Sequence, residues 1–112
     1  MLNRRHKNSG RQHKGKRSPS HLKWIRGHDC AVSNKDCKGK IEAAHVRRGT
    51  DGGSGVKPSD KWTIPLCGYH HQQQHREGEI TFEVMHGIDL KEIAEKAFNR
   101  SPYRRDFETS ND

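Results

Sequence analysis

The sequence predicts a small α+β domain that a bound metal ion helps to fold, with a ββα unit set between short flanking helices. The chain has 112 residues, of which only 28% are hydrophobic, and its mean hydropathy is −1.24. A domain this small and polar cannot bury a large apolar core, so it needs a metal, disulfides or a partner to fold. Three cysteines and nine histidines supply side chains that can bind metal.

The ββα unit is predicted from the middle of the chain. Residues 40–46 indicate a first strand and residues 62–66 a second, in which Pro65 suggests an edge or a strand end because proline donates no ladder hydrogen bond. Residues 47–60 between them are rich in Gly and Ser, as expected of a long loop. A helix is expected to begin after Tyr69.

Helices are predicted on both sides of this unit. Ser18 and Pro19 have the chemistry of an N-cap followed by the first helical residue, and that helix should end near Gly27. After residue 79 we expect two short helices, the first stopped by Gly87 and the second capped by Asp89. Their apolar residues fall at helical spacing and are expected in the core: Phe82, Val84, Met85, Leu90, Ile93, Ala94, Ala97 and Phe98.

Positive charge is concentrated near the N-terminus. Residues 1–26 hold nine Lys and Arg and no acid, whereas the rest holds thirteen bases against fourteen acids, within a net charge of +8. A basic arm on a nearly neutral body favours a polyanion such as DNA, through phosphate neutralisation and counterion release. A solubilising tail is the alternative. We therefore expect a disordered basic arm at 1–17, a folded domain at 18–100 and a polar C-terminal tail at 101–112.

The cysteines indicate a structural zinc site. No secretory or membrane-length apolar run is evident, so a reduced, cytoplasmic compartment without membrane association is expected, where thiols bind metal. Cys67 and His70 have the C-x-x-H spacing of a zinc knuckle. Cys30 and Cys37 are spaced more widely than usual and need a small hairpin to bring their sulfurs together. The four ligands would form a closed tetrahedral site, with three unliganded buried cysteines as the alternative.

A second metal is indicated by His71 and His75. Residues at i and i+4 share one face of a helix, so both side chains can reach one ion. Adjacent residues point about 100° apart on a helix, so His70 can face the zinc while His71 faces the second metal. A histidine pair of this kind is more often solvated surface, and its position directly after the zinc knuckle is what favours a site.

A general base is indicated by His45, near the end of the first predicted strand. The unperturbed pKa of histidine lies near working pH, which suits proton transfer. Two arginines, Arg47 and Arg48, follow it. The alternative interpretation is an ordinary polar strand residue with a satisfied hydrogen bond.

Together these elements resemble the HNH, or ββα-metal, endonuclease superfamily, and in particular the small HNH proteins of phages and prophages. The resemblance spans about residues 18–98. It rests on the runs AHVRRG at 44–49, GSGVKPSD at 53–60 and PLCGYHH at 65–71. The motif His71-x3-His75-Arg76 is similar to the metal-binding end of bacteriocin-type HNH nucleases.

The resemblance implies a metal-dependent DNA endonuclease that hydrolyses phosphodiester bonds. His45 would take a proton from the attacking water, and a divalent metal (Mg²⁺, Mn²⁺ or Zn²⁺) on His71 and His75 would stabilise the pentacovalent phosphorus and the departing 3′ oxygen. Four cations would neutralise the surrounding phosphates, namely Arg47, Arg48, Lys57 and Arg76.

Two departures from the family pattern affect the expected metal ligands. Ala44 stands where the family commonly has an Asp or His ligand, and residues 46–66 contain no equivalent of the middle asparagine. Asp60 is the nearest replacement, as a metal ligand or as an orienting group. Glu42, on the same strand face as Ala44, is a weaker candidate.

These departures leave two rival functions open. One is a non-catalytic, zinc-stabilised nucleic-acid-binding module that has lost a metal ligand. The other is a recombination-accessory protein that recruits a partner through the basic arm. Cleavage of DNA under Mg²⁺ or Mn²⁺ separates the endonuclease from both rivals. The sequence makes no prediction of oligomeric state.

Overall fold

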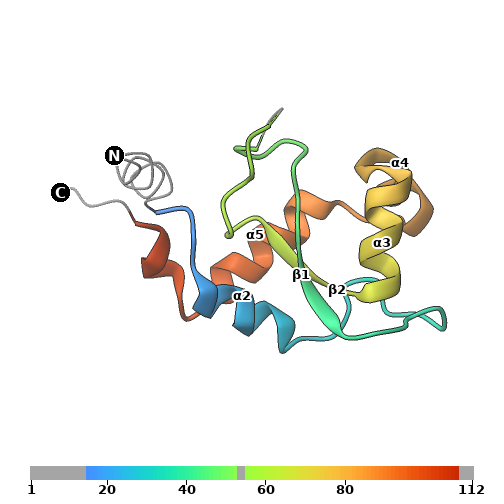
Figure 1. Ribbon diagram of the computed structural model, residues 1–112, viewed down its shortest axis with the longest axis horizontal. Helices are drawn as coiled ribbons and strands as arrows, with labels where there is room; N and C mark the ends of the chain where they lie inside the picture. The colour runs from blue at the N-terminus through green and yellow to red at the C-terminus, as the bar shows by residue number, and fades with distance from the viewer. Residues whose placement is uncertain (1–14, 53–54, 109–112) are drawn as a thin grey trace, which may run out of the picture.

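The computed structural model describes residues 15–52 and 55–108, and the α+β class expected from the sequence is confirmed. The expected disorder of the arm falls mostly on residues 1–14, which lie outside the described part of the chain. The elements follow in the order α2 (Pro19–Arg26), β1 (Ile41–His45), β2 (Thr63–Cys67), α3 (Gly68–Glu77), α4 (Glu79–His86), α5 (Leu90–Arg100) and the 3₁₀ helix η1 (Arg104–Phe107) (Figure 1).

The two strands form one antiparallel sheet, in which Ile41 lies opposite Cys67 and His45 lies opposite Thr63. All five residues of β2 are buried. Both strands are edges in a two-stranded sheet, so the edge position expected of Pro65 is confirmed. The register places His45 at the end of the sheet from which the long loop leaves and to which it returns (Figure 1).

The core lies around β2. Helices α5, α2 and α3 all contact this strand, and α4 packs against α3. Helix α2 adds Ile25, and most of the other buried apolar side chains come from the sheet and the residue after β1, from α4 and from α5: Ala44, Val46, Ile64, Leu66, Phe82, Leu90 and Ala94. Because this core is small, the polar contacts described below are needed to position the functional groups.

The helix boundaries follow the predicted capping residues. Ser18 Oγ accepts a hydrogen bond from the N–H of His21, with Pro19 as the first helical residue. Asp89 caps α5 through the N–H of Glu92. Gly87 ends α4 in the left-handed conformation, at φ 63°, which favours glycine because a Cβ is strained there. These short-range signals were therefore sufficient to predict where α2 and α5 begin and where α4 ends.

Two predictions about the helices were wrong. Helix α3 begins at Gly68 rather than after Tyr69, because the sulfur of Cys67 caps it by accepting from the N–H of His70. Val84 and Met85 were expected in the core, but 78% and 49% of their surfaces are exposed. Phe82 takes the inward position on α4, and Val84, two residues further, points about 200° away from it.

Residues 101–108 pack against α2 and extend the folded body past residue 100. The ring of Phe107 meets His21 edge-on at a centroid distance of 5.3 Å. Asp106 accepts a 2.6 Å hydrogen bond from Ser18 Oγ, directly at the N-cap of α2. The C-terminal segment thus holds the start of α2 in place.

Within the described residues, none of the helices has both the length and the apolar character needed to cross a membrane.

The buried His21 gives the fold a pH-dependent stability. Its side chain has no exposed surface, and Nδ1 lies 2.8 Å from Ser101 Oγ. Burial lowers the pKa of His21, and the nearby carboxylates Asp60 and Asp106 offset this only in part. The unfolded chain therefore takes up this proton more readily than the native protein does.

We expect the free energy of unfolding to decrease as the pH falls below about 6.5, the unperturbed histidine pKa, by at most about 1.4 kcal/mol per pH unit from this group. Replacement His21→Gln should flatten this dependence, measured by urea denaturation across pH 5 to 8. His28→Gln, at an exposed histidine, is the control. Equal slopes in wild type and His21→Gln would refute the assignment.

Candidate functional site

Four metal-binding side chains meet beside the β2–α3 corner. Cys30 and Cys37 come from the segment between α2 and β1, Cys67 ends β2, and His70 lies in the first turn of α3. Their ligand atoms all lie within 4.8 Å of one another, so the group could hold a metal ion. The sulfurs of Cys30 and Cys37 are each 3.6 Å from His70 Nδ1, and that of Cys67 is 3.2 Å away.

The predicted hairpin between the two distant cysteines is present as a tight turn. Asn34 forms it by accepting from the N–H of Asp36 with its side chain and from the N–H of Cys37 with its carbonyl. The turn shows how Cys30 and Cys37 meet although six residues lie between them. The chain leaves the group after Cys30, reverses at Asn34 and returns at Cys37.

Burial dominates the acid–base chemistry of this group. It raises the pKa of the Cys30 thiol to about 11. Burial also opposes ionisation of Cys67, but the N–H groups of His70 and Lys38 stabilise its thiolate, and the net pKa is lower than usual. Burial lowers the pKa of His70 and so favours the neutral imidazole that a metal requires.

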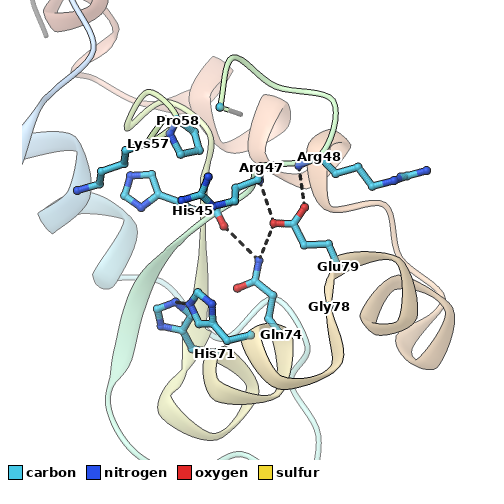
Figure 2. A pocket seen from close by; sticks show the side chains of 11 residues that line it. His45, Arg47, Arg48, Lys57, Pro58, His71, Gln74, Gly78 and Glu79 are labelled. Carbon is cyan, nitrogen blue, oxygen red and sulfur yellow. Dashed lines mark hydrogen bonds between the residues drawn. The ribbon is translucent and has the colours of Figure 1, made fainter. Parts of the chain in front are cut away.

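A second constellation lines an open cleft of about 850 Å³ (Figure 2). The cleft brings together six of the residues that the sequence singled out, which come from β1, the long loop and α3. These residues are His45, Arg47, Arg48, Lys57, His71 and His75.

A hydrogen bond to Asp60 orients the imidazole ring of His45. The Nε2 atom of His45 lies 2.8 Å from Asp60 Oδ1, and Asp60 Oδ2 accepts from the backbone N–H of Ser18 at 2.9 Å. Only 2% of Asp60 is exposed. Burial alone would raise its pKa, but hydrogen bonds from His45 and Ser18 and the charge of Arg17 outweigh this, so the net pKa is lowered. Asp60 is therefore an ionised acceptor.

This arrangement determines the tautomer of a neutral His45. An ionised carboxylate accepts hydrogen bonds only, so the proton of the imidazole resides on Nε2. The lone pair of the ring is then on Nδ1. Asp60 does not line the cleft, and its position corresponds to the orienting role of the two roles considered from the sequence.

The histidines of α3 form a chain with Glu42. His71 Nδ1 lies 2.6 Å from Glu42 Oε1, and His71 Nε2 lies 3.2 Å from His75 Nε2. Glu42 therefore binds the far side of the His71 ring, away from the nitrogen that faces His75. Carboxylates in this position fix the tautomer of metal-binding histidines and raise their basicity.

The predicted phosphate-binding residues are divided between the cleft and the outer surface. Arg47, Arg48 and Lys57 line the cleft. Arg76 does not line it, and its Nε instead lies 3.4 Å from Glu77 Oε2 on the exposed side of α3. Arg76 lies one residue after His75, so its side chain points about 100° away from it on the helix.

Sequence reasoning missed Glu79, a residue of the cleft lining that fixes the backbone after β1. Its carboxylate accepts from the backbone N–H groups of Arg47 and Arg48, at 2.9 and 2.8 Å, and from Gln74 Nε2 at 3.3 Å. Gln74 Nε2 also donates to the backbone carbonyl of His45, at 3.1 Å (Figure 2). These bonds tie the segment after β1 to α3 and α4. No short-range sequence signal marks the bonds to residues 45–48, because their partners are about thirty residues away in the sequence.

The chain belongs to a protein family described as Protein of unknown function (DUF968), which matches residues 10–102. The match covers the cysteine group, the whole lining of the cleft and α5. No curated protein and no solved structure matches the chain.

The His45–Asp60 contact predicts a specific tautomer. In the wild type, neutral His45 should carry its proton on Nε2. In Asp60→Asn the side-chain amide can donate to Nε2, which favours the other tautomer. Long-range ¹H–¹⁵N correlation of the histidine rings at pH 8 distinguishes the two. Asp51→Asn, at an exposed carboxylate of the same loop, is the control, and an unchanged His45 tautomer in Asp60→Asn would contradict the assignment.

Proposed function

We propose that the protein is a metal-dependent endonuclease of the HNH type, which hydrolyses phosphodiester bonds of DNA on a ββα-metal unit formed by β1, β2 and α3. The observation that carries this proposal is the shared cleft. A histidine oriented by a buried carboxylate opens into the same cationic cleft as a pair of histidines on one helix face.

In this mechanism His45 acts as the general base. Its Nε2–H bond to Asp60 keeps Nδ1 unprotonated, and Nδ1 accepts a proton from the water that attacks phosphorus in line. As the imidazole becomes positively charged, the ionised Asp60 stabilises it. Gln74 and Glu79 hold the backbone at His45 and Arg47, so the base approaches the scissile phosphate from a fixed position.

His71 and His75 fit the separation of two nitrogens on one cation. Ligand distances of about 2.1 Å place cis nitrogens roughly 3.0–3.4 Å apart in octahedral or tetrahedral geometry, and the Nε2 atoms are 3.2 Å apart. When bound there, a divalent metal supplies Lewis-acid stabilisation of the phosphate charge and of the leaving 3′ oxygen. Glu42 contributes by orienting His71 through Nδ1.

The remaining cations of the cleft suit a nucleic-acid backbone. Arg47, Arg48 and Lys57 surround the histidines, and Arg48 also contacts Glu83 at 3.4 Å. Phosphate contacts of this kind position DNA without reading its sequence. Substrate binding should therefore depend on salt more than on base composition.

The cysteine group fits zinc in a structural role. Tetrahedral ligation with Zn–S of about 2.3 Å and Zn–N of about 2.1 Å places each sulfur roughly 3.6 Å from the nitrogen. The distances to His70 Nδ1 are 3.6, 3.6 and 3.2 Å. Four protein ligands leave no position for water, which is the property of a folding site rather than a reactive one.

One observation favours the non-catalytic alternative, a zinc-stabilised nucleic-acid-binding module. Ala44, the residue before His45, has no exposed surface and offers no ligand. The cleft then supplies two protein ligands to a metal rather than three. The alternative predicts DNA binding with no cleavage under any metal.

Adjacent histidines give the sharpest test of the two metal roles. Purified protein should contain one tightly bound zinc per chain, measured by mass spectrometry of the metal content. His70→Ala should release it and largely unfold the domain, because a structural site is part of the folding free energy. His71→Ala, one residue away, should retain both zinc and fold. If His71→Ala instead lost zinc and unfolded while His70→Ala stayed folded, His71 would be the zinc ligand and His70 would belong to the cleft.

Plasmid nicking tests the activity itself. With Mg²⁺ or Mn²⁺, His45→Ala should lower the rate by about 10²–10⁴, the usual contribution of a general base, without change in fold or zinc content. His75→Ala should raise the concentration of Mg²⁺ or Mn²⁺ needed for half-maximal rate. His28→Ala, at an exposed histidine outside the cleft, should behave as wild type. Intact, zinc-loaded wild type that nicks DNA with none of the metals would refute the endonuclease.

A further inference from the structure

A second pocket, of about 400 Å³, lies between the start of β2 and the outer face of α5. It is lined by Lys61 and Trp62 from the chain before β2 and by Glu95, Phe98 and Asn99 from α5. Two aromatic rings, a cation and two polar side chains thus surround one small pocket. None of these residues takes part in the cleft chemistry described above.

Lysines cover the aromatic rings of this pocket. Lys61 Nζ lies 5.1 Å from the ring centre of Trp62 and 5.5 Å from that of Phe98. Lys91 Nζ lies 5.6 Å from the ring centre of Trp62. A partly exposed tryptophan flanked by ammonium groups combines the two features that bind a single-stranded nucleic acid, an aromatic face for a base and positive charge for its phosphates.

We propose that this pocket takes an unpaired base of the DNA substrate, which stacks on Trp62 while Lys61 and Lys91 neutralise the adjoining phosphates. The proposal rests on the proposed endonuclease function and specifies its substrate as DNA with unpaired nucleotides near the scissile bond. The base must be unpaired, because a base within a duplex has both faces covered by its neighbours. Glu95 repels phosphate from the pocket and so favours the base over the backbone inside it.

The free energy of binding favours replacing Lys61 by a base on the ring of Trp62. A base stacked on an aromatic side chain contributes more to the free energy of binding than an exposed lysine over the same ring does. An incoming base therefore displaces Lys61 from the ring face. The freed ammonium group remains within reach of the phosphate of the same nucleotide, so its charge is not lost to binding.

The pocket is close enough to the cleft for one DNA strand to reach both. Pro58 lines the cleft, and Trp62 follows four residues later, which places the two at most about 14 Å apart along the chain. That span equals roughly four nucleotides at 3.4 Å each. The side chain of Lys91 also lies near Gly49, 3.5 Å from the place that a Cβ would occupy. Helix α5 therefore approaches the loop that borders the cleft.

Tryptophan fluorescence tests the proposal directly. The chain has two tryptophans, so Trp24→Phe leaves Trp62 as the only one. Trp24 is the tryptophan to replace because its ring stacks on His21 and meets His28 edge-on, and it does not line the pocket. In zinc-loaded protein without added Mg²⁺ or Mn²⁺, a short oligo(dT) strand should quench Trp62, and a blunt duplex of equal length should not.

Binding by variants supplies the second measurement. Trp62→Leu should weaken oligo(dT) affinity about 5- to 100-fold, with little change for the blunt duplex. Trp62→Phe, which keeps an aromatic face and serves as the folding control, should retain most of the affinity, and Trp24→Phe should match wild type. Absence of quenching, equal quenching by the duplex, or equal oligo(dT) affinity of Trp62→Leu and wild type would each overturn the proposal.

The outcome of the quenching experiment can be distinguished from the outcome of the nicking assay. Quenching is measured without a catalytic metal, so it does not depend on cleavage. Quenching together with an inactive wild type would refute the endonuclease and support a single-strand-binding role for the pocket. Nicking without quenching would refute the base-stacking site alone.

Discussion

The convergence of three cysteines and His70 constrains most of the structure around the functional cleft. The group joins the segment after α2, the end of β2 and the first turn of α3, so one cluster of side chains ties three separate parts of the chain together. Cys67 has two functions here, since its sulfur also caps α3. The direction of α3 relative to the sheet is therefore set by the same atoms that can bind the metal.

That direction determines which histidine faces which site. With His70 directed at the cysteines, the helical rotation of about 100° per residue turns His71 toward β1 and the cleft. His71 then meets Glu42 on β1 and His75 one turn further along α3. A shift of one residue that turned His71 toward the cysteines would turn Gln72 toward the cleft, so the cysteine group and the open cleft depend on the same helix register.

Short-range signals account for what could be predicted from the sequence. The N-caps Ser18 and Asp89, the stop at Gly87 and the i, i+4 pair on α3 are each defined by neighbouring residues. The His45–Asp60 contact was only partly foreseen, because a spacing of fifteen residues left two roles open for Asp60. The contacts of Glu79 with Arg47 and Arg48 could not be foreseen, since they depend on how α4 packs. The predicted burial of Val84 and Met85 was wrong for a related reason, because apolar character alone does not determine which face of a short helix packs against the core.

Ala44 stands where the HNH pattern that the sequence resembles commonly has a metal ligand, and its burial shows why a carboxylate would not suit this position. A carboxylate at position 44 would be fully desolvated, because the side chain there has no exposed surface, and an ionised buried group requires charged or hydrogen-bonding partners. Glu42 lies two residues earlier on the same face of β1 and has half of its side chain exposed. It reaches His71 through Nδ1 rather than through a shared ion. In the proposed endonuclease, Glu42 would act on the ligand His71 where the HNH pattern places a carboxylate next to the metal, which would leave more of the metal's coordination positions to water and substrate.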